Sequence, residues 1–191
     1  ATRLPGLPAS SIIVCGGKPD VGKSTIAMES AAYAQKQGIV PVFIITENKF
    51  SPERGEKMGI DFKNTIIYNG VKTIEEGCDY VKKVLDDQES GKLGFDVLII
   101  WDSIGSTPSI AELKKQEEET GRAMMETAKV INEKIGRYLS HRINNTRNES
   151  YPYNATFLII NQAYTQPPDM PGAPPKIVFR GGDGATYAAS L

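Results

Sequence analysis

The sequence predicts an α/β domain with a doubly wound, mostly parallel sheet and helices on both of its faces. Short, β-branched apolar runs alternate with helical segments along the chain, the order that parallel sheets with crossover helices produce. The apolar runs are nearly continuous, which is typical of strands buried on both faces of a sheet. The 191 residues fit one domain.

Strands and helices follow from these patterns in order. The predicted strands are Ile12–Cys15, Val42–Thr46, Ile66–Tyr68, Val97–Trp101 and Phe157–Asn161. The predicted helices, which have apolar residues at helical spacing, are Ser24–Gln37, Thr73–Gln88 and Arg122–Ile143. Thr73 and Glu76 form a capping-box pattern at the start of the second helix. The polar segment Asn144–Ala155 and the proline-rich segment Ala163–Arg180 are predicted as irregular connections.

A motif at the first strand–helix junction indicates a phosphate ligand. Residues 17–24 read Gly-Lys-Pro-Asp-Val-Gly-Lys-Ser and match G-x-x-x-x-G-K-[ST] in the strand–loop–helix context that a P-loop requires. The two glycines allow backbone N–H groups to surround phosphate oxygens, and the following helix offers its positive end to the same anion. We expect Lys23 to reach the β- and γ-phosphates and Ser24 to hold Mg²⁺. The expected nucleotide contacts are Gly17, Lys18, Pro19, Asp20, Val21, Gly22, Lys23, Ser24 and Thr25.

Polar residues follow three of the other predicted strands, where ligands bind in such sheets. Asp102 closes an apolar run in a Walker B pattern and is expected in the Mg²⁺ shell, although many buried strands end in a capping aspartate. Glu47 could polarise the water that attacks the γ-phosphate, or could equally be a surface residue at a turn. Gln162 could hydrogen-bond a γ-phosphate and report its presence, or could be a polar strand terminus.

Composition limits the remaining function classes. A net charge of −1 gives no overall attraction to nucleic acid, so any DNA binding must come from local basic loops. No apolar run approaches the roughly 20 residues of a membrane span, and the first residues lack the apolar core of a signal peptide. We therefore expect a cytoplasmic protein without membrane contact, in which Cys15 and Cys78 are buried free thiols.

Taken together, these motifs resemble the RecA-type recombinase core, a family that includes bacterial RecA and phage UvsX-like proteins. The resemblance extends from Gly6 over nearly the whole chain. The matching motifs, in the family's order, are the P-loop, Thr46-Glu47, Asp102-Ser103, Asn161-Gln162 and Gly181-Gly182 leading into Tyr187–Ser190. It implies a single RecA-like ATPase core over residues 1–191, without the family's N-terminal polymerisation segment and C-terminal part.

The resemblance also implies an activity. The family forms helical filaments on single-stranded DNA by self-association, pairs them with double-stranded DNA, and hydrolyses ATP with Mg²⁺ when DNA is bound. Glu47 would be the catalytic glutamate, and Gln162 would couple the γ-phosphate to a DNA-binding loop. The family's topology would put the strand Phe157–Asn161 between the P-loop strand and the Walker B strand. The family usually has an aromatic residue near Arg54, whose guanidinium plane could stack on adenine instead.

Two DNA-binding loops are implied, at Pro108–Arg122 and Ala163–Arg180. Basic residues would neutralise phosphates, glycines would permit close approach, and an apolar side chain would wedge between bases. The expected DNA contacts are Lys114, Lys115, Arg122, Lys176, Phe179, Arg180, Gly181 and Gly182. The first loop departs from this pattern because Glu117–Glu119 would repel DNA phosphates.

Two alternatives share many of these motifs. A ring helicase of the same superfamily would carry the same P-loop and Walker B strand. A non-catalytic recombination mediator would bind DNA and turn over little ATP, although the set Lys23, Ser24, Glu47 and Asp102 favours an active ATPase.

Overall fold

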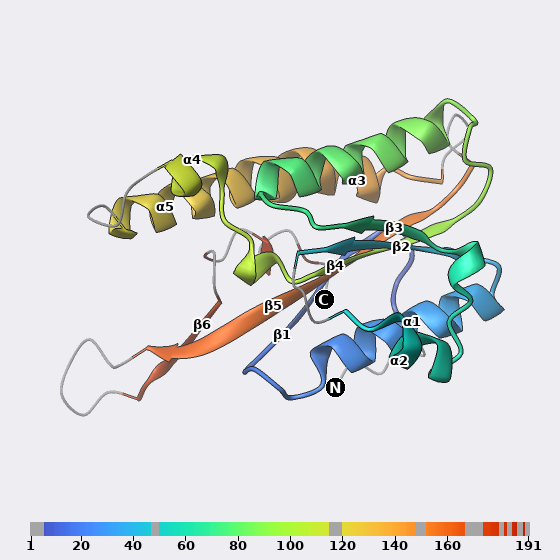
Figure 1. The fold of residues 1–191 in the computed structure, drawn as a ribbon. Helices are drawn as coiled ribbons and strands as arrows, with labels where there is room; N and C mark the ends of the chain where they lie inside the picture. Colours follow the sequence, from blue (N-terminus) through green and yellow to red (C-terminus); the bar gives the residue numbers. More distant parts are fainter. Residues whose placement is uncertain are drawn as a thin grey trace.

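A six-stranded sheet forms the centre of the molecule (Figure 1). The computed structural model describes residues 6–46, 50–114, 120–147, 152–166, 174–179, 182, 185–186 and 189. The strands are β1 (Ile12–Gly17), β2 (Val40–Ile45), β3 (Ile66–Asn69), β4 (Val97–Asp102), β5 (Ala155–Gln166) and β6 (Lys176–Phe179). The α-helices are α1 (Lys23–Lys36), α2 (Pro52–Lys57), α3 (Ile74–Glu89), α4 (Ile110–Lys114), α5 (Thr120–Ile131) and α6 (Ser140–Asn144). η1 (Phe62–Asn64) and η2 (Ile104–Ser106) are short 3₁₀-helices, and η4 (Asn132–Leu139) is a π-helix.

The strand order is β1-β5-β4-β2-β3, and every neighbouring pair in this series is parallel. β6 is the exception, because it pairs with β5 in the antiparallel sense. The predicted doubly wound α/β fold is therefore confirmed. β5 lies between β1, the strand that leads into the P-loop, and β4, the Walker B strand, as the resemblance implied.

Alternating side chains divide the core into two layers, one on each face of the sheet. In β4, Val97, Ile99 and Trp101 join the cluster that contains α3 and η4. Leu98 and Ile100 point to the opposite face and join the cluster that contains α1. Figure 1 shows α3 and α5 on one side of the sheet and α1 and α2 on the other. Burial on both faces explains why these strands read as continuous apolar runs.

Trp101 sets how closely α3 approaches the sheet. Its ring is fully buried and stacks near Phe157, with ring centroids 6.4 Å apart. On the α3 side, the ring lies against Gly77, where a β-carbon would overlap two ring atoms. The start of α3 is capped as predicted, since Thr73 Oγ1 accepts a hydrogen bond from Glu76 N at 3.2 Å. The reciprocal bond differs from a standard capping box, because Glu76 Oε2 accepts from Lys72 N.

The long helix predicted over Arg122–Ile143 is a continuous rod built from α5, η4 and α6. Its buried residues Ile131, Ile135, Leu139 and Ile143 repeat every four positions, slightly wider than the 3.6-residue period of an α-helix. A π-helical stretch in the middle of the rod has a wider turn, which keeps this stripe facing the sheet. Within the described ranges, no helix combines the length and apolar character needed to cross a bilayer.

The segment Ala163–Arg180 was predicted as an irregular loop, but its two described ends pair with each other as the strands of a β-hairpin. β5 continues to Gln166, and β6 pairs with it from Ala163↔Phe179 to Gln166↔Lys176. The β-branched pair Ile177-Val178 favours a strand, but the neighbouring prolines masked that signal in the sequence. In the sequence, all five prolines of this segment lie between β5 and β6 and none lies within either strand.

The predicted loop Pro108–Arg122 also contains regular structure. α4 begins after Ser109, whose Oγ accepts from Glu112 N at 3.1 Å. The Thr127 hydroxyl of α5 contacts both ends of this cap, since its Oγ1 lies 2.9 Å from Ser109 Oγ and 2.7 Å from Glu112 Oε2, and its one proton can go to either acceptor. Ser109-x-x-Glu112 is itself a capping-box pattern, so the sequence contained the signal for this helix.

Both cysteines are free thiols. Burial raises the pKa of Cys78 to about 12. Burial also raises the pKa of Cys15 in β1, while the positive charge of Lys23 acts in the opposite direction. Both thiols are therefore protonated at neutral pH and are poor nucleophiles.

Gly77→Ala should destabilise the fold. The added methyl would overlap the Trp101 ring, which is fully buried, at a cost of about 3 kcal/mol. The gain in helix propensity, about 1 kcal/mol, offsets part of this cost. We expect the free energy of unfolding in urea to fall by about 2 kcal/mol. Gly6→Ala is the control, because a β-carbon there meets nothing within 4 Å; equal stability of the two variants would contradict the packing.

Candidate functional site

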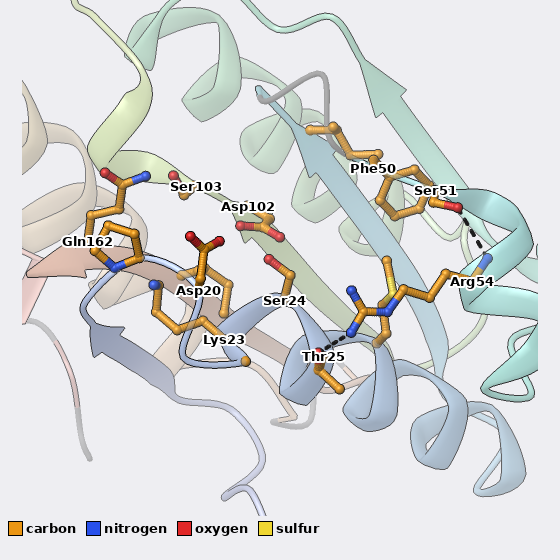
Figure 2. A pocket seen from close by; sticks show the side chains of 15 residues that line it. Asp20, Lys23, Ser24, Thr25, Phe50, Ser51, Arg54, Asp102, Ser103 and Gln162 are labelled. Atoms are coloured by element: carbon orange, nitrogen blue, oxygen red, sulfur yellow. Dashed lines mark hydrogen bonds between the residues drawn. The ribbon is translucent and has the colours of Figure 1, made fainter.

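The carboxyl ends of β1, β2 and β4 meet at one edge of the sheet, where β5 continues past them to Gln166. Gly17 at the end of β1 lies opposite Gln162 of β5, and Asp102 at the end of β4 lies opposite Ile45 of β2. A cavity of about 330 Å³ opens at this edge. It is lined by most of the residues predicted to hold the nucleotide, namely Pro19, Asp20, Gly22, Lys23, Ser24, Thr25, Arg54, Asp102 and Gln162 (Figure 2).

The loop between β1 and α1 has the geometry of a phosphate cradle. Gly22 has φ 92°, a left-handed conformation that glycine adopts without strain. A β-carbon on Gly17 would lie only 3.1 Å from Cγ2 of Val21 across the loop. α1 begins directly after Gly22, so the unpaired N–H groups and the positive dipole end of its first turn lie at the cavity. The loop can therefore bind an anion through backbone groups alone.

Lys23 is buried by the loop it follows. Its side chain is 9% exposed, and its Nζ donates a hydrogen bond to the main-chain oxygen of Lys18 at 2.6 Å. The ammonium group thus lies inside the turn of the loop, where phosphate oxygens would compete with this carbonyl for its protons. A buried, already oriented cation interacts with an anion more strongly than a hydrated one on the surface.

Two oxygen ligands suited to Mg²⁺ face each other across the cavity. Figure 2 shows the Ser24 hydroxyl and the Asp102 carboxylate turned toward one another. Hydroxyl and carboxylate oxygens are the hard ligands that Mg²⁺ prefers. The described part of the chain contains no cluster of three His, Cys, Asp or Glu side chains that could hold a metal by itself. The site therefore fits an ion that takes its other ligands from water and phosphates.

Thr46 joins the end of β2 to the end of β4. Its backbone N donates to the main-chain oxygen of Asp102 at 3.2 Å, and its Oγ1 accepts from Ser103 N at 3.1 Å. Further hydrogen bonds hold Ser103, which is 1% exposed and lines the cavity. Glu47 itself lies outside the described residues, so its predicted role stays a prediction. The bonds of Thr46 fix the point from which the chain leaves toward Glu47.

The far end of the cavity combines a cation with an aromatic ring. Arg54 of α2 donates from Nη2 to Thr25 Oγ1 on α1 (Figure 2). Phe50 lies beside it in the lining and packs on Phe43, with ring centroids 5.3 Å apart. Phe50, a lone aromatic in a polar run, was not predicted as a site residue, and Ser103 was named only as part of the Asp102-Ser103 motif. Stacking of Arg54 on a base stays a prediction.

None of the predicted DNA-binding residues that the structure describes lines this cavity. Lys114 is exposed at the end of α4, and Lys176 is exposed at the start of β6. Phe179, at the other end of β6, is half-buried. Gly182 has a left-handed backbone with φ 77° and lies close to Ala128 of α5. Lys115, Arg180 and Gly181 lie outside the described residues, and the side chain of Arg122 is not described either.

Comparison with known proteins agrees with this architecture. The family model described as RecA N-terminal domain matches residues 1–181. Protein RecA of Aquifex aeolicus (strain VF5) is 29% identical over 164 residues, which is 85% of this chain and 42% of that protein. Protein RecA of Rhizobium leguminosarum bv. viciae is 30% identical over 120 residues, or 63% of this chain and 32% of that protein. Protein RecA of Mycobacterium ulcerans (strain Agy99) is 32% identical over 114 residues, 60% of this chain and 31% of that protein.

The sheet order, the loop at Gly17–Ser24 and the acidic end of β4 define a P-loop domain with a RecA-like core. Because the family model covers nearly the whole chain, the chain belongs to the RecA family. It spans less than half the length of the curated relatives that it matches.

Lys23→Ala should weaken nucleotide binding. The substitution removes the buried ammonium group, and a hydrogen bond to a charged partner contributes about 1.5–3 kcal/mol, so we expect affinity for ATP to fall at least about tenfold. Titration with a fluorescent ATP analogue measures the change. Lys36→Ala, at the exposed far end of the same helix, is the control. Unchanged affinity of Lys23→Ala would contradict the assignment.

Proposed function

We propose that this chain is the ATPase core of a recombinase that forms filaments on single-stranded DNA and promotes homologous pairing and strand exchange. The observation that supports this most strongly is the path of β5. One strand passes the P-loop at Gln162 and then continues into the β5–β6 hairpin, which extends away from the sheet in Figure 1. The backbone of one strand therefore links the candidate nucleotide site to a hairpin that carries Lys176.

ATP would bind with its phosphates on Gly17–Thr25 and its base toward Arg54. Lys23 would exchange its bond with the Lys18 carbonyl for bonds to phosphate oxygens. Ser24 and Asp102 would hold Mg²⁺, directly or through water. When bound, the ion would supply positive charge that offsets the charge of the phosphates.

Glu47 would orient and polarise the attacking water. It directly follows Thr46, whose bonds to Asp102 and Ser103 tie the end of β2 to the Mg²⁺ side of the cavity. A carboxylate at this point can accept a proton from water during in-line attack on the γ-phosphate.

Gln162 would respond to the γ-phosphate and transmit its presence along β5. Its amide can donate to a phosphate oxygen, and Figure 2 shows it on the same side of the cavity as Lys23. DNA contacts would come from Lys176 at the start of β6, from Arg180, the next residue in the sequence after β6, and from Gly181 and Gly182. The remaining contacts would come from Lys114, Lys115 and Arg122 at the α4–α5 connection. Neutralising DNA phosphates would make binding strongly salt-dependent.

Assays on the full-length protein test this function. We expect ATP hydrolysis that is stimulated by single-stranded DNA, together with joint-molecule formation between homologous DNAs. Directional unwinding of a duplex without joint molecules would instead identify a ring helicase. DNA binding without appreciable turnover would identify a mediator. Absence of stimulation by single-stranded DNA would contradict the proposal.

Glu47→Gln should separate binding from turnover. Because the amide cannot accept the proton, ATP hydrolysis should fall by a factor of about 10²–10⁴ while affinity for ATP stays close to that of the parent protein. Steady-state phosphate release and nucleotide titration measure the two quantities. Glu53→Gln, exposed on nearby α2, should leave both unchanged. Hydrolysis by Glu47→Gln at the parent rate would show that another group activates the water.

A further inference from the structure

The aromatic ring of Phe179 lies directly on the strand that leads into the P-loop. A β-carbon built on Gly16 would overlap Cε1 of this ring and would lie 2.8 Å from Cζ and 3.0 Å from Cδ1. Gly16 is not among the residues with positive φ, so its backbone does not itself require glycine. The close approach of the ring explains the glycine, because any side chain would occupy the place of the ring.

The ladder puts this contact beside the nucleotide site. Along β5, three consecutive residues pair first with β1 and then with β6. Asn161 lies opposite Gly16, Gln162 lies opposite Gly17, and Ala163 lies opposite Phe179. The phenyl ring of β6 therefore packs one residue before the first glycine of the P-loop, next to the strand position of Gln162.

The chain that follows β6 is attached to the body of the protein. Gly182 N donates to the Phe179 oxygen at 3.2 Å, a β-carbon on Gly182 would lie 3.1 Å from Cβ of Ala128, and Ala185 is buried in the core. Toward the tip, in contrast, Ile177 is 71% exposed. Phe179 thus lies where the exposed part of the hairpin joins the packed body.

We propose that Phe179 is a positioning residue that couples the P-loop to the hairpin through its contact with Gly16. This inference rests on the proposed nucleotide-controlled DNA binding. In the structure, the Lys23 ammonium group bonds the Lys18 carbonyl inside the loop. Phosphate binding would take over that donor and change the backbone of the loop that starts at Gly17. A shift of Gly16 would then move the ring and β6 with it, because packed side chains leave little free space between them.

This route differs from a hydrogen bond between Gln162 and phosphate, since it uses only packing. It also differs from the predicted role of Phe179 as a wedge between bases. Coupling free energy is reciprocal, so single-stranded DNA should raise affinity for nucleotide by the same factor by which nucleotide raises affinity for DNA. That ratio distinguishes a coupling residue from a contact residue.

The experiment compares Phe179→Ala with Ile177→Ala in the full-length protein. Affinity for oligo(dT) is measured with and without a non-hydrolysable ATP analogue and Mg²⁺. In the parent protein we expect nucleotide to tighten DNA binding at least about fivefold. Phe179→Ala should reduce this ratio to near one, Ile177→Ala should retain it, and Phe179→Leu should retain most of it because an apolar side chain still covers Gly16. Affinity for the analogue without DNA should stay within about twofold of the parent value for all three.

Two results would overturn the inference alone. One is an unchanged ratio in Phe179→Ala. The other is a DNA affinity that falls equally with and without nucleotide, which would identify Phe179 as a direct DNA contact. If the parent protein itself shows no effect of nucleotide on DNA binding, the proposed function fails, and the coupling role fails with it.

A double substitution tests the contact independently of activity. Gly16→Ala should lower the thermal midpoint because its methyl group overlaps the ring. Adding Phe179→Ala removes the obstruction, so the double variant should be more stable than Gly16→Ala alone. Additive losses of stability would show that the ring does not lie on Gly16 in solution.

Discussion

The parallel pairing of β1 with β5 is the constraint on which the site depends. Six consecutive residue pairs, from Ile12↔Phe157 to Gly17↔Gln162, hold the two strands in one register. A slip of one residue would exchange the two faces of β5, so that Phe157 and Ile159 would have to fit the layer that now holds Leu158 and Ile160, and the reverse. Close packing on both faces therefore specifies this register. The same register fixes Gln162 next to the P-loop. The hydrophobic core of the sheet therefore also determines the arrangement of the polar groups at its edge.

The edge of the sheet combines a rigid base with groups that a ligand can rearrange. β4 and β5 are buried along most of their length, and β1 is buried at Ile12 and Ile13, whereas the P-loop leaves the sheet and closes on itself through Lys23. A bound phosphate would compete for that one internal bond without disturbing the strands below. Such local change on a fixed scaffold suits the proposed alternation between nucleotide states.

The sequence predicted the parts of the fold whose chemistry is local. Buried strands read as apolar runs, and the P-loop octet specified a ligand and its geometry together. The β6 strand was not predicted because its apolar run is short and follows two prolines. The strand is stabilised by pairing with β5, and a local sequence pattern cannot show such a tertiary contact. The hydrogen bond from Arg54 to Thr25 and the ring of Phe179 on Gly16 also depend on the tertiary fold. A lone arginine or phenylalanine carries no sign of such a partner in the sequence.

In the proposed function, nucleotide binding at the P-loop also changes the β5–β6 hairpin. Amide hydrogen exchange of the full-length protein, with and without a non-hydrolysable ATP analogue and Mg²⁺, measures this directly. We expect slower exchange in the P-loop and also in β6 (Lys176–Phe179) when nucleotide is bound, with β3 (Ile66–Asn69) at the far edge unchanged. Protection of the P-loop with unchanged exchange in β6 would contradict it.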